Sequence, residues 1–232
     1  MIVINPNKNE TITVDGITYS RFAIKTHVIT KDDCMEEVVE NYVQPHLQNG
    51  DIVFVSEKAV ACTESRAIAL VDIKPRKLAV FLSRYVHKTK HGIGLGMPET
   101  MEMALRECGV LPILFAAAVS VVGKTLGQKG WFYHIAGEKA RSIDGPCPNT
   151  LPPYNKYVVL GPKNPMKTAK SIADRIGCGV AIVDINDLGS NILGYSKINM
   201  SAENLRKILM DNVLGQSSEC TPLGIVRKWE TQ

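Results

Sequence analysis

Short apolar segments alternate with amphipathic segments along this chain, and the alternation limits the folds open to it. Apolar, β-branched runs at 51–56, 179–184 and 223–227 are typical of buried strands. Between them, segments such as 35–43 and 75–86 place their apolar residues on one face of a helix. This pattern predicts an α/β or mixed α+β class, in which helices flank a mixed β-sheet.

Turn and cap residues set the ends of further elements. The Asp15-Gly16 turn predicts a β-hairpin within 11–19, and its second arm is expected to continue to residue 29. The residues 30–33 supply candidates for the N-cap of the next helix. Proline, asparagine and glycine at segment ends predict three more helices, over 98–108, 165–176 and 201–212.

Two apolar segments are predicted as strands. The segment 111–122 is strongly apolar and β-branched, which is typical of a strand buried on both faces, and 131–136 is predicted as a further strand. The residues 118–125 almost spell a phosphate-binding loop, but Ala118 stands where that motif has glycine. We therefore interpret 118–125 as a strand end and turn.

The sequence predicts one domain over 1–232. A chain of this length can form one large domain or two small ones. The segment 137–155 carries four prolines and no periodicity, and long segments of that kind inside a domain are often functional. It is the one place where the composition would allow a division of the chain.

Composition excludes several classes of protein. The net charge of +4 is spread along the chain, which argues against a nucleic-acid partner. The longest apolar run, 110–122, is shorter than a transmembrane helix, and 1–30 show no secretory signal. Six cysteines without a C-x-x-C pair predict reduced thiols. We expect a cytoplasmic protein that binds neither nucleic acid nor membrane.

A glycine-rich segment is the first candidate site. Gly92, Gly94 and Gly96 precede a helix that begins with proline, and Lys88 and Lys90 lie just before them. Backbone amides without side chains, next to a helix start, can bind an anion or an acidic substrate. The alternative is a tight structural connection with a solvated basic run, and the sequence leaves both interpretations open.

Carboxylates after apolar strands form the second candidate site. Asp184 and Asn186 follow the apolar segment 179–183, and Asp144 lies in a proline-rich loop. Hard oxygen ligands of this kind bind magnesium or manganese that also carry phosphates. We favour a metal for Asp144 and Asp184, whereas capping or turn formation is the strong alternative for Asn186. The polar loop Gln216, Ser217, Ser218 and Glu219 could also contact a ligand.

Six short motifs occur in an order and spacing known from one family. They lie at 24–33, 50–58, 63–66, 142–144, 183–186 and 215–219. On these motifs the chain resembles the coenzyme F-420-0:gamma-glutamyl ligase family over most of its length, as a divergent member. That family uses GTP and a divalent metal to join the amine of L-glutamate to the carboxylate tail of a deazaflavin.

The resemblance implies an α/β fold of the family's own kind, an intertwined homodimer and small-molecule substrates. It implies a nucleotide site built from Lys25, Thr26, His27, Val28, Glu57, Lys58, Gly215, Gln216, Ser217, Ser218 and Glu219. It implies metal ligands at Asp144, Asp184, Asn186 and Gln216. Lys58, Asp144 and Asp184 would act in catalysis, in which the nucleotide's γ-phosphoryl group activates a carboxylate as an acyl phosphate.

Three departures from the family pattern leave alternatives open. Cys62 stands where the family has a nucleotide-contacting lysine, Ile185 where it has a threonine, and Gln216 where it has a carboxylate. The main alternative is a nucleotide- or anion-binding protein of the same fold without ligase activity. The sequence also leaves open whether the nucleotide is GTP or ATP, and whether one metal ion or two are bound.

Overall fold

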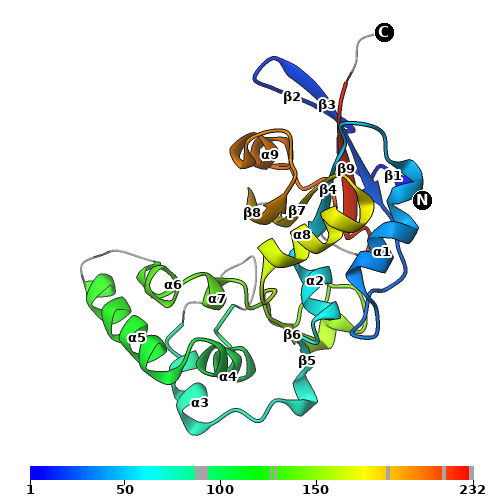
Figure 1. The fold of residues 1–232 in the computed structure, drawn as a ribbon. Helices are drawn as coiled ribbons and strands as arrows, with labels where there is room; N and C mark the ends of the chain where they lie inside the picture. The colour runs from blue at the N-terminus through cyan, green and yellow to red at the C-terminus, as the bar shows by residue number, and fades with distance from the viewer. Residues whose placement is uncertain (87–93, 126, 128–129, 187–188, 216–217, 230–232) are drawn as a thin grey trace. The chain divides into compact units, whose positions relative to one another are not determined.

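The computed structural model describes residues 1–86, 94–125, 127, 130–186, 189–215 and 218–229. The chain forms two compact units, one of 1–65 with 162–232 and the other of 66–161, called unit 1 and unit 2 below (Figure 1). Unit 2 is inserted in the sequence of unit 1, and the chain passes between them outside 137–155. The single family domain over 1–232 stays a prediction.

Unit 1 is built on a seven-stranded mixed sheet, which confirms the predicted class. The strand order is β1-β3-β9-β4-β7-β8, with β2 beside β3; β4 and β7 are parallel and the other pairs antiparallel. The strands are β1 Ile2–Val3, β2 Thr11–Val14, β3 Ile17–Ile24, β4 Ile52–Ser56, β7 Gly179–Asn186, β8 Gly189–Ser196 and β9 Leu223–Lys228. The Asp15-Gly16 hairpin is confirmed, but β3 ends at Ile24 rather than at residue 29.

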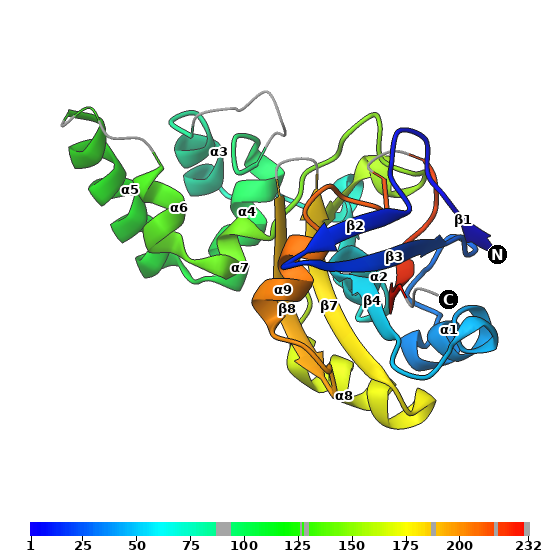
Figure 2. The same cartoon turned by 90° about the horizontal axis from the view of Figure 1, so that it is seen from above.

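Helices cover both faces of the central strands (Figure 2). The helices are α1 Met35–Tyr42, α2 Glu57–Thr63, α8 Pro165–Ile176 and α9 Ala202–Ile208, with a 3₁₀ turn at Gln44–His46. Phe54, Ala181 and Leu205 belong to one buried cluster, which places α9 on that face of the sheet. Because successive residues of a strand face opposite sides, Val53 and Ile182 are buried on the other face.

The sequence predicted some of these helix ends correctly and others not. Asn164 caps α8 by accepting the Lys167 N–H at 3.0 Å, and Gly177 ends it with φ 74°. The last predicted helix is shorter than expected, because α9 ends at Ile208. The N-cap of α1 is Cys34 and not a residue of 30–33, whose polar groups bond one another instead.

The strand β9 is central in the sheet and passes close to its neighbours. It lies between β3 and β4, antiparallel to both. A Cβ atom at Gly224 would lie 2.6 Å from the carbonyl oxygen of Phe22 and would overlap the ring of Phe54. Only glycine therefore fits at this position of β9.

Unit 2 is mainly helical. Its helices are α3 Lys77–Ser83, α4 Pro98–Glu107, α5 Val110–Thr125, α6 Trp131–Ala136 and α7 Glu138–Arg141. A two-stranded antiparallel sheet pairs β5, Ala67–Ala69, with β6, Tyr157–Val159, and 3₁₀ turns lie at Leu70–Asp72 and Tyr154–Lys156. Leu95, Met101 and Ile113 are among the fully buried residues of its core.

Two strand predictions in unit 2 are wrong. The segment 111–122 lies in α5 and 131–136 forms α6, so 118–125 is not a strand end either. An apolar run alone does not separate a buried strand from a helix, and the length of sixteen residues favours a helix. Pro112 fits the first turn, where no intrahelical bond needs its missing N–H. The segment 137–155, expected to lack regular structure, contains α7.

One side of α5 is apolar and exposed. Leu111 is 79% exposed and Phe115 63%, and Val121 and Val122 are also exposed. Ile113 and Ala116, on the other side, are fully buried. Within the described residues no single helix is long and apolar enough to cross a membrane; α4 and α5, bent by 120°, reach that length and composition only as a pair.

Candidate functional site

Four of the segments predicted to bind ligand end at one edge of the sheet in unit 1. In the parallel pair of β4 and β7, Ser56 lies opposite Val183, so Glu57 and Asp184 follow at the same edge. Carboxyl ends of neighbouring parallel strands are a common place for ligand sites. The sheet thus brings the 57–58 segment beside Asp184.

The other two segments reach this edge through β9. Leu223, the first residue of β9, lies opposite Val55 of β4 and opposite Ile24 of β3. The residues after Ile24 and those before Leu223 therefore leave the sheet at the edge where β4 ends. Together, the segments 25–28, 57–58, 184–186 and 218–222 form what we call the site edge.

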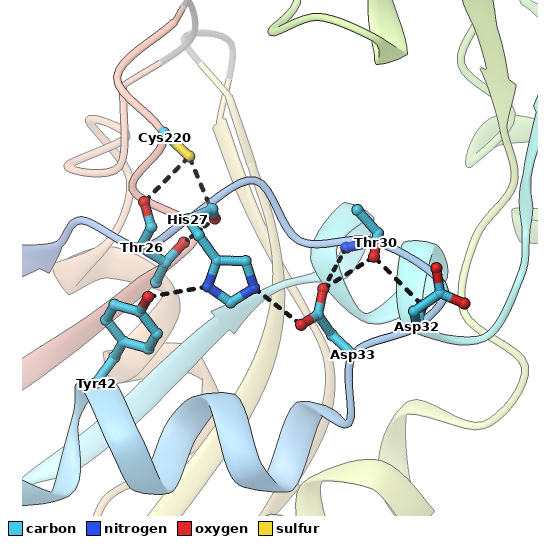
Figure 3. Close-up of polar contacts among 7 residues, drawn as sticks. All are labelled: Thr26, His27, Thr30, Asp32, Asp33, Tyr42 and Cys220. Atoms are coloured by element: carbon cyan, nitrogen blue, oxygen red, sulfur yellow. Dashed lines mark hydrogen bonds and ion pairs between the residues drawn. The ribbon is translucent and has the colours of Figure 1, made fainter.

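Hydrogen bonds tie two of these segments together (Figure 3). The Thr26 N–H donates to the Cys220 carbonyl at 3.0 Å, and the Cys220 thiol lies 3.5 Å from the carbonyl oxygens of Thr26 and His27. The Ser56 N–H donates to the carbonyl of Pro222 at 2.8 Å. The 25–28 segment, the end of β4 and the loop before β9 are thus held side by side.

The imidazole of His27 is held at both nitrogens (Figure 3). Its Nδ1 lies 2.9 Å from the Tyr42 hydroxyl and its Nε2 lies 2.9 Å from Oδ1 of Asp33. The second oxygen of Asp33 accepts the N–H of Thr30 at 2.7 Å and its hydroxyl at 3.1 Å. In this arrangement the His27 side chain fixes the 25–28 segment against α1.

Asp33 has a lowered pKa, which gives a testable pH dependence. Burial raises the pKa of its carboxyl, but hydrogen bonds from Thr30 and His27 outweigh this and lower it below its ordinary value. A lowered pKa stabilises the fold above the pKa of the unfolded chain, and that stabilisation is lost as the pH falls through the folded value.

We expect Asp33→Asn to lower the free energy of unfolding by about 1 kcal/mol at pH 7, since the carboxylate is partly exposed. Urea unfolding of both proteins between pH 7 and pH 3 should show the difference shrinking in acid. Asp32→Asn is the matched control, because Asp32 takes part in the network drawn in Figure 3 through its backbone N–H, which the substitution keeps. A difference that does not change with pH would contradict this role.

Lys58 and Glu57 lie where β4 passes into α2. The Glu57 side chain is buried, and its Oε1 lies 2.8 Å from Nζ of Lys58, whose side chain is 29% exposed. The pair places a cation and a carboxylate at the site edge.

The last loop, 215–219, is described only in part. Gly215 has φ 77° and lies against the Glu219 side chain, and Ser218 is exposed. Gln216 and Ser217 lie outside the described residues.

The predicted metal ligands fall in both units. Asp184 and Asn186 lie in β7 on the face opposite Ala181 and Val183, which pack with α9. Asp144 belongs to unit 2, where its backbone pairs with Val159. The part of the chain that is described holds no cluster of three or more His, Cys, Asp or Glu side chains placed for a metal. A metal site shared by Asp144 and Asp184 stays a prediction.

The glycine-rich segment is described only in part. Lys88, Lys90 and Gly92 lie outside the described residues. Gly94 has φ 49°, and a Cβ atom at this position would lie 2.5 Å from the Tyr133 hydroxyl oxygen. The next residue, Leu95, donates its backbone N–H to the same hydroxyl at 3.1 Å. Gly96 is buried. The contacts of Gly94 and Leu95 favour the structural interpretation for this half of the segment, and anion binding at the other half stays a prediction.

Sequence reasoning missed the polar contacts that shape the site edge. No sequence pattern indicated a role for Cys220 or Tyr42, yet both bond the 25–28 segment. Asp33 was a cap candidate and instead bonds His27. The sheet topology creates the contacts of Cys220, and the packing of α1 beside the 25–28 segment creates those of Tyr42 and Asp33, so their spacing in the sequence gives no signal.

A comparison with known protein families matches most of the chain. The family model described as F420-0:Gamma-glutamyl ligase matches residues 23–201. The match covers both units and includes all the proposed site segments except the last loop. No curated protein matches the sequence. Because the matched region is more than half of the chain, the protein belongs to the F420-0:gamma-glutamyl ligase family, whose members are ligases of coenzyme F420 biosynthesis.

Proposed function

We propose that this ligase uses a nucleotide, GTP before ATP, and a divalent cation, Mg²⁺ or Mn²⁺, to join an amino acid such as L-glutamate to a carboxylic acid. The observation that carries the proposal is the site edge, where four separate segments that carry a cation and carboxylates come together. The family match supports the ligase class. We also propose a cytoplasmic location, because the six cysteines form no C-x-x-C pair and are expected to be reduced, and a homodimer, on the family resemblance alone.

The donor set at the end of β7 fits a hard cation. Asp184 and Asn186 are two residues apart in one strand, so their oxygens lie on the same face. With Asp144 they would hold the metal, which when bound neutralises phosphate charge. Gln216 is a further proposed ligand. Bound there, a cation would lie close to the segment that carries Lys58.

The chain's own residues have separate roles in the proposed reaction. Amide formation from a carboxylate is uphill in water, and an acyl phosphate overcomes this because phosphate is a good leaving group. Phosphoryl transfer depends on positioning and charge neutralisation. Lys58 would bind phosphate oxygens, while the 25–28 segment, fixed by His27, and the 215–219 loop would orient the nucleotide.

Thermal unfolding of the full chain tests nucleotide and metal binding. The samples contain GTP, ATP, GDP or no nucleotide, each with and without Mg²⁺ or Mn²⁺. A ligand at 100 times its dissociation constant that binds only the folded state adds about 2.7 kcal/mol to stability. We expect a metal-dependent rise of the melting temperature, largest with GTP, and a smaller rise in Lys58→Met. No rise with any nucleotide would contradict the proposal.

A phosphate-release assay separates the ligase from the binding protein. A ligase releases phosphate only when both the acid and the amine are present. Metal-dependent nucleotide binding without such release, across a panel of acids and amino acids, would favour the alternative of a nucleotide-binding protein.

A further inference from the structure

Two arginines of unit 2 share one buried carboxylate. Glu102 in α4 is 1% exposed, and its carboxylate accepts the Arg76 N–H at 3.1 Å and Nε of Arg76 at 3.1 and 3.0 Å. Nε of Arg106 donates to it at 2.8 Å. Burial raises the pKa of this carboxyl, but the bonds from Arg76 and Arg106 lower it below its ordinary value, so Glu102 is ionised at neutral pH.

The cluster keeps a net positive charge. One carboxylate faces two guanidinium groups, which remain protonated at any physiological pH. Both Nε atoms bond the same oxygen, Oε1 of Glu102, so the two cations lie side by side. Like charges at this separation repel, and the repulsion would be relieved by a second anion.

The guanidinium groups also keep unused donors. Arg76 and Arg106 donate to Glu102 through Nε, and the structure, over the residues it describes, gives their Nη atoms no acceptor. The two side chains are 49% and 47% exposed. Glu102 is buried and fixes the Nε ends, so the Nη ends are held in place near the surface.

We propose that Arg76 and Arg106 form a binding site for an oxyanion, the carboxylate or phosphate group of a small acidic ligand. Guanidinium groups bind both anions through pairs of parallel N–H···O bonds, and donors fixed in advance lose little entropy on binding. None of the residues proposed above for nucleotide or metal belongs to this cluster. The inference therefore goes beyond the proposed function and does not depend on it.

The test follows the arginine Nε–Hε signals by NMR in the full chain, without nucleotide or metal. Sodium phosphate and sodium glutarate are titrated separately at constant ionic strength, with sodium chloride as the balance. We expect the Arg76 and Arg106 signals to shift and saturate with at least one probe. The probe that saturates at the lower concentration shows whether phosphate or carboxylate is preferred. The absence of a saturable shift with both probes would overturn the proposal.

Two variants separate a fixed site from general surface charge. In Arg106→Gln, Glu102 keeps its hydrogen bonds from Arg76. The affinity for the anion, measured on the Arg76 Nε–Hε signal, should fall about tenfold. Arg84→Gln, the matched control, removes the same charge from an exposed position after α3 and should leave binding unchanged. Equal weakening in both variants would overturn the site, since it indicates diffuse attraction.

A third variant distinguishes a loss of the anion site from a folding defect. Arg106→Lys keeps the charge but loses the paired donors, so its affinity should fall between those of the wild type and Arg106→Gln. Arg106 could instead serve only to hold α4. In that case Arg106→Gln would lower the melting temperature in chloride and leave phosphate and glutarate binding intact, and the proposal would fail.

Discussion

Replacing Asp184 with asparagine should lower metal-dependent ligase turnover by at least about 100-fold and leave the fold intact. Asp184 lies in the outer part of β7, where it is only half-buried, so the amide is accommodated sterically. Asparagine keeps one oxygen ligand but loses the negative charge that, on the proposal, would bind the cation. The measurement is phosphate release at saturating nucleotide, acid and amine, as a function of Mg²⁺ or Mn²⁺ concentration.

The controls isolate the role of the charge. Asp15→Asn changes a carboxylate of the same unit at a hairpin turn with φ 50°, which asparagine tolerates. It should retain wild-type turnover and the same dependence on metal concentration. If Asp184→Asn also kept wild-type turnover, Asp184 would not be a metal ligand. If both variants lost activity equally, the loss would not be specific to the site edge.

Replacing Gly224 with alanine should give the largest loss of stability, about 3 kcal/mol. The added methyl group would lie 2.6 Å from the Phe22 carbonyl oxygen and would overlap the Phe54 ring. The Phe22 carbonyl belongs to the backbone of β3, which pairs with β9, and the Phe54 ring is fully buried, so neither neighbour has room to shift cheaply. Urea unfolding followed by circular dichroism measures the change.

Two further variants separate crowding from the loss of glycine's flexibility. Gly50→Ala has no atom within 4 Å of its new methyl group and carries only the strain of φ 86°, so it should cost about 1 kcal/mol. Phe54→Leu removes the overlapping ring. The double variant Gly224→Ala/Phe54→Leu should therefore lose less stability than the sum of the two single variants. Strict additivity would contradict the proposed contact.

The sequence predicted the sheet of unit 1 better than the helices of unit 2. In unit 1 the alternation of β-rich runs, the Asp15-Gly16 turn and the capped helix α8 each carry a local signal, and all three are confirmed. In unit 2 the run over 111–122 has a single polar residue, Ser120, which cannot set a period, and the run lies in α5. The exposed side of α5 is apolar as well, so its composition is the same as that of a segment buried on all sides.

The site was predicted in its parts but not in its arrangement. The resemblance named the 25–28, 57–58 and 215–219 segments, and the strand pairing brings 25–28, 57–58 and the described residues just before β9 to one edge. The bonds of His27 to Tyr42 and Asp33 arise only once α1 lies beside the end of β3, so no local pattern reports them. Strand pairing is a long-range property, and short motifs do not contain it.

The central place of β9 also sets the order in which the protein can fold as it is synthesised. All of unit 2 leaves the ribosome before β9 does, so its helices can pack while unit 1 is still incomplete. Until β9 arrives, β3 and β4 have no strand between them, and their inner edges expose unpaired backbone groups. A nascent chain stopped before Leu223 would therefore have the complete sequence of unit 2 but a divided, aggregation-prone sheet in unit 1. Pairing of β9 with β3 and β4 would complete that sheet.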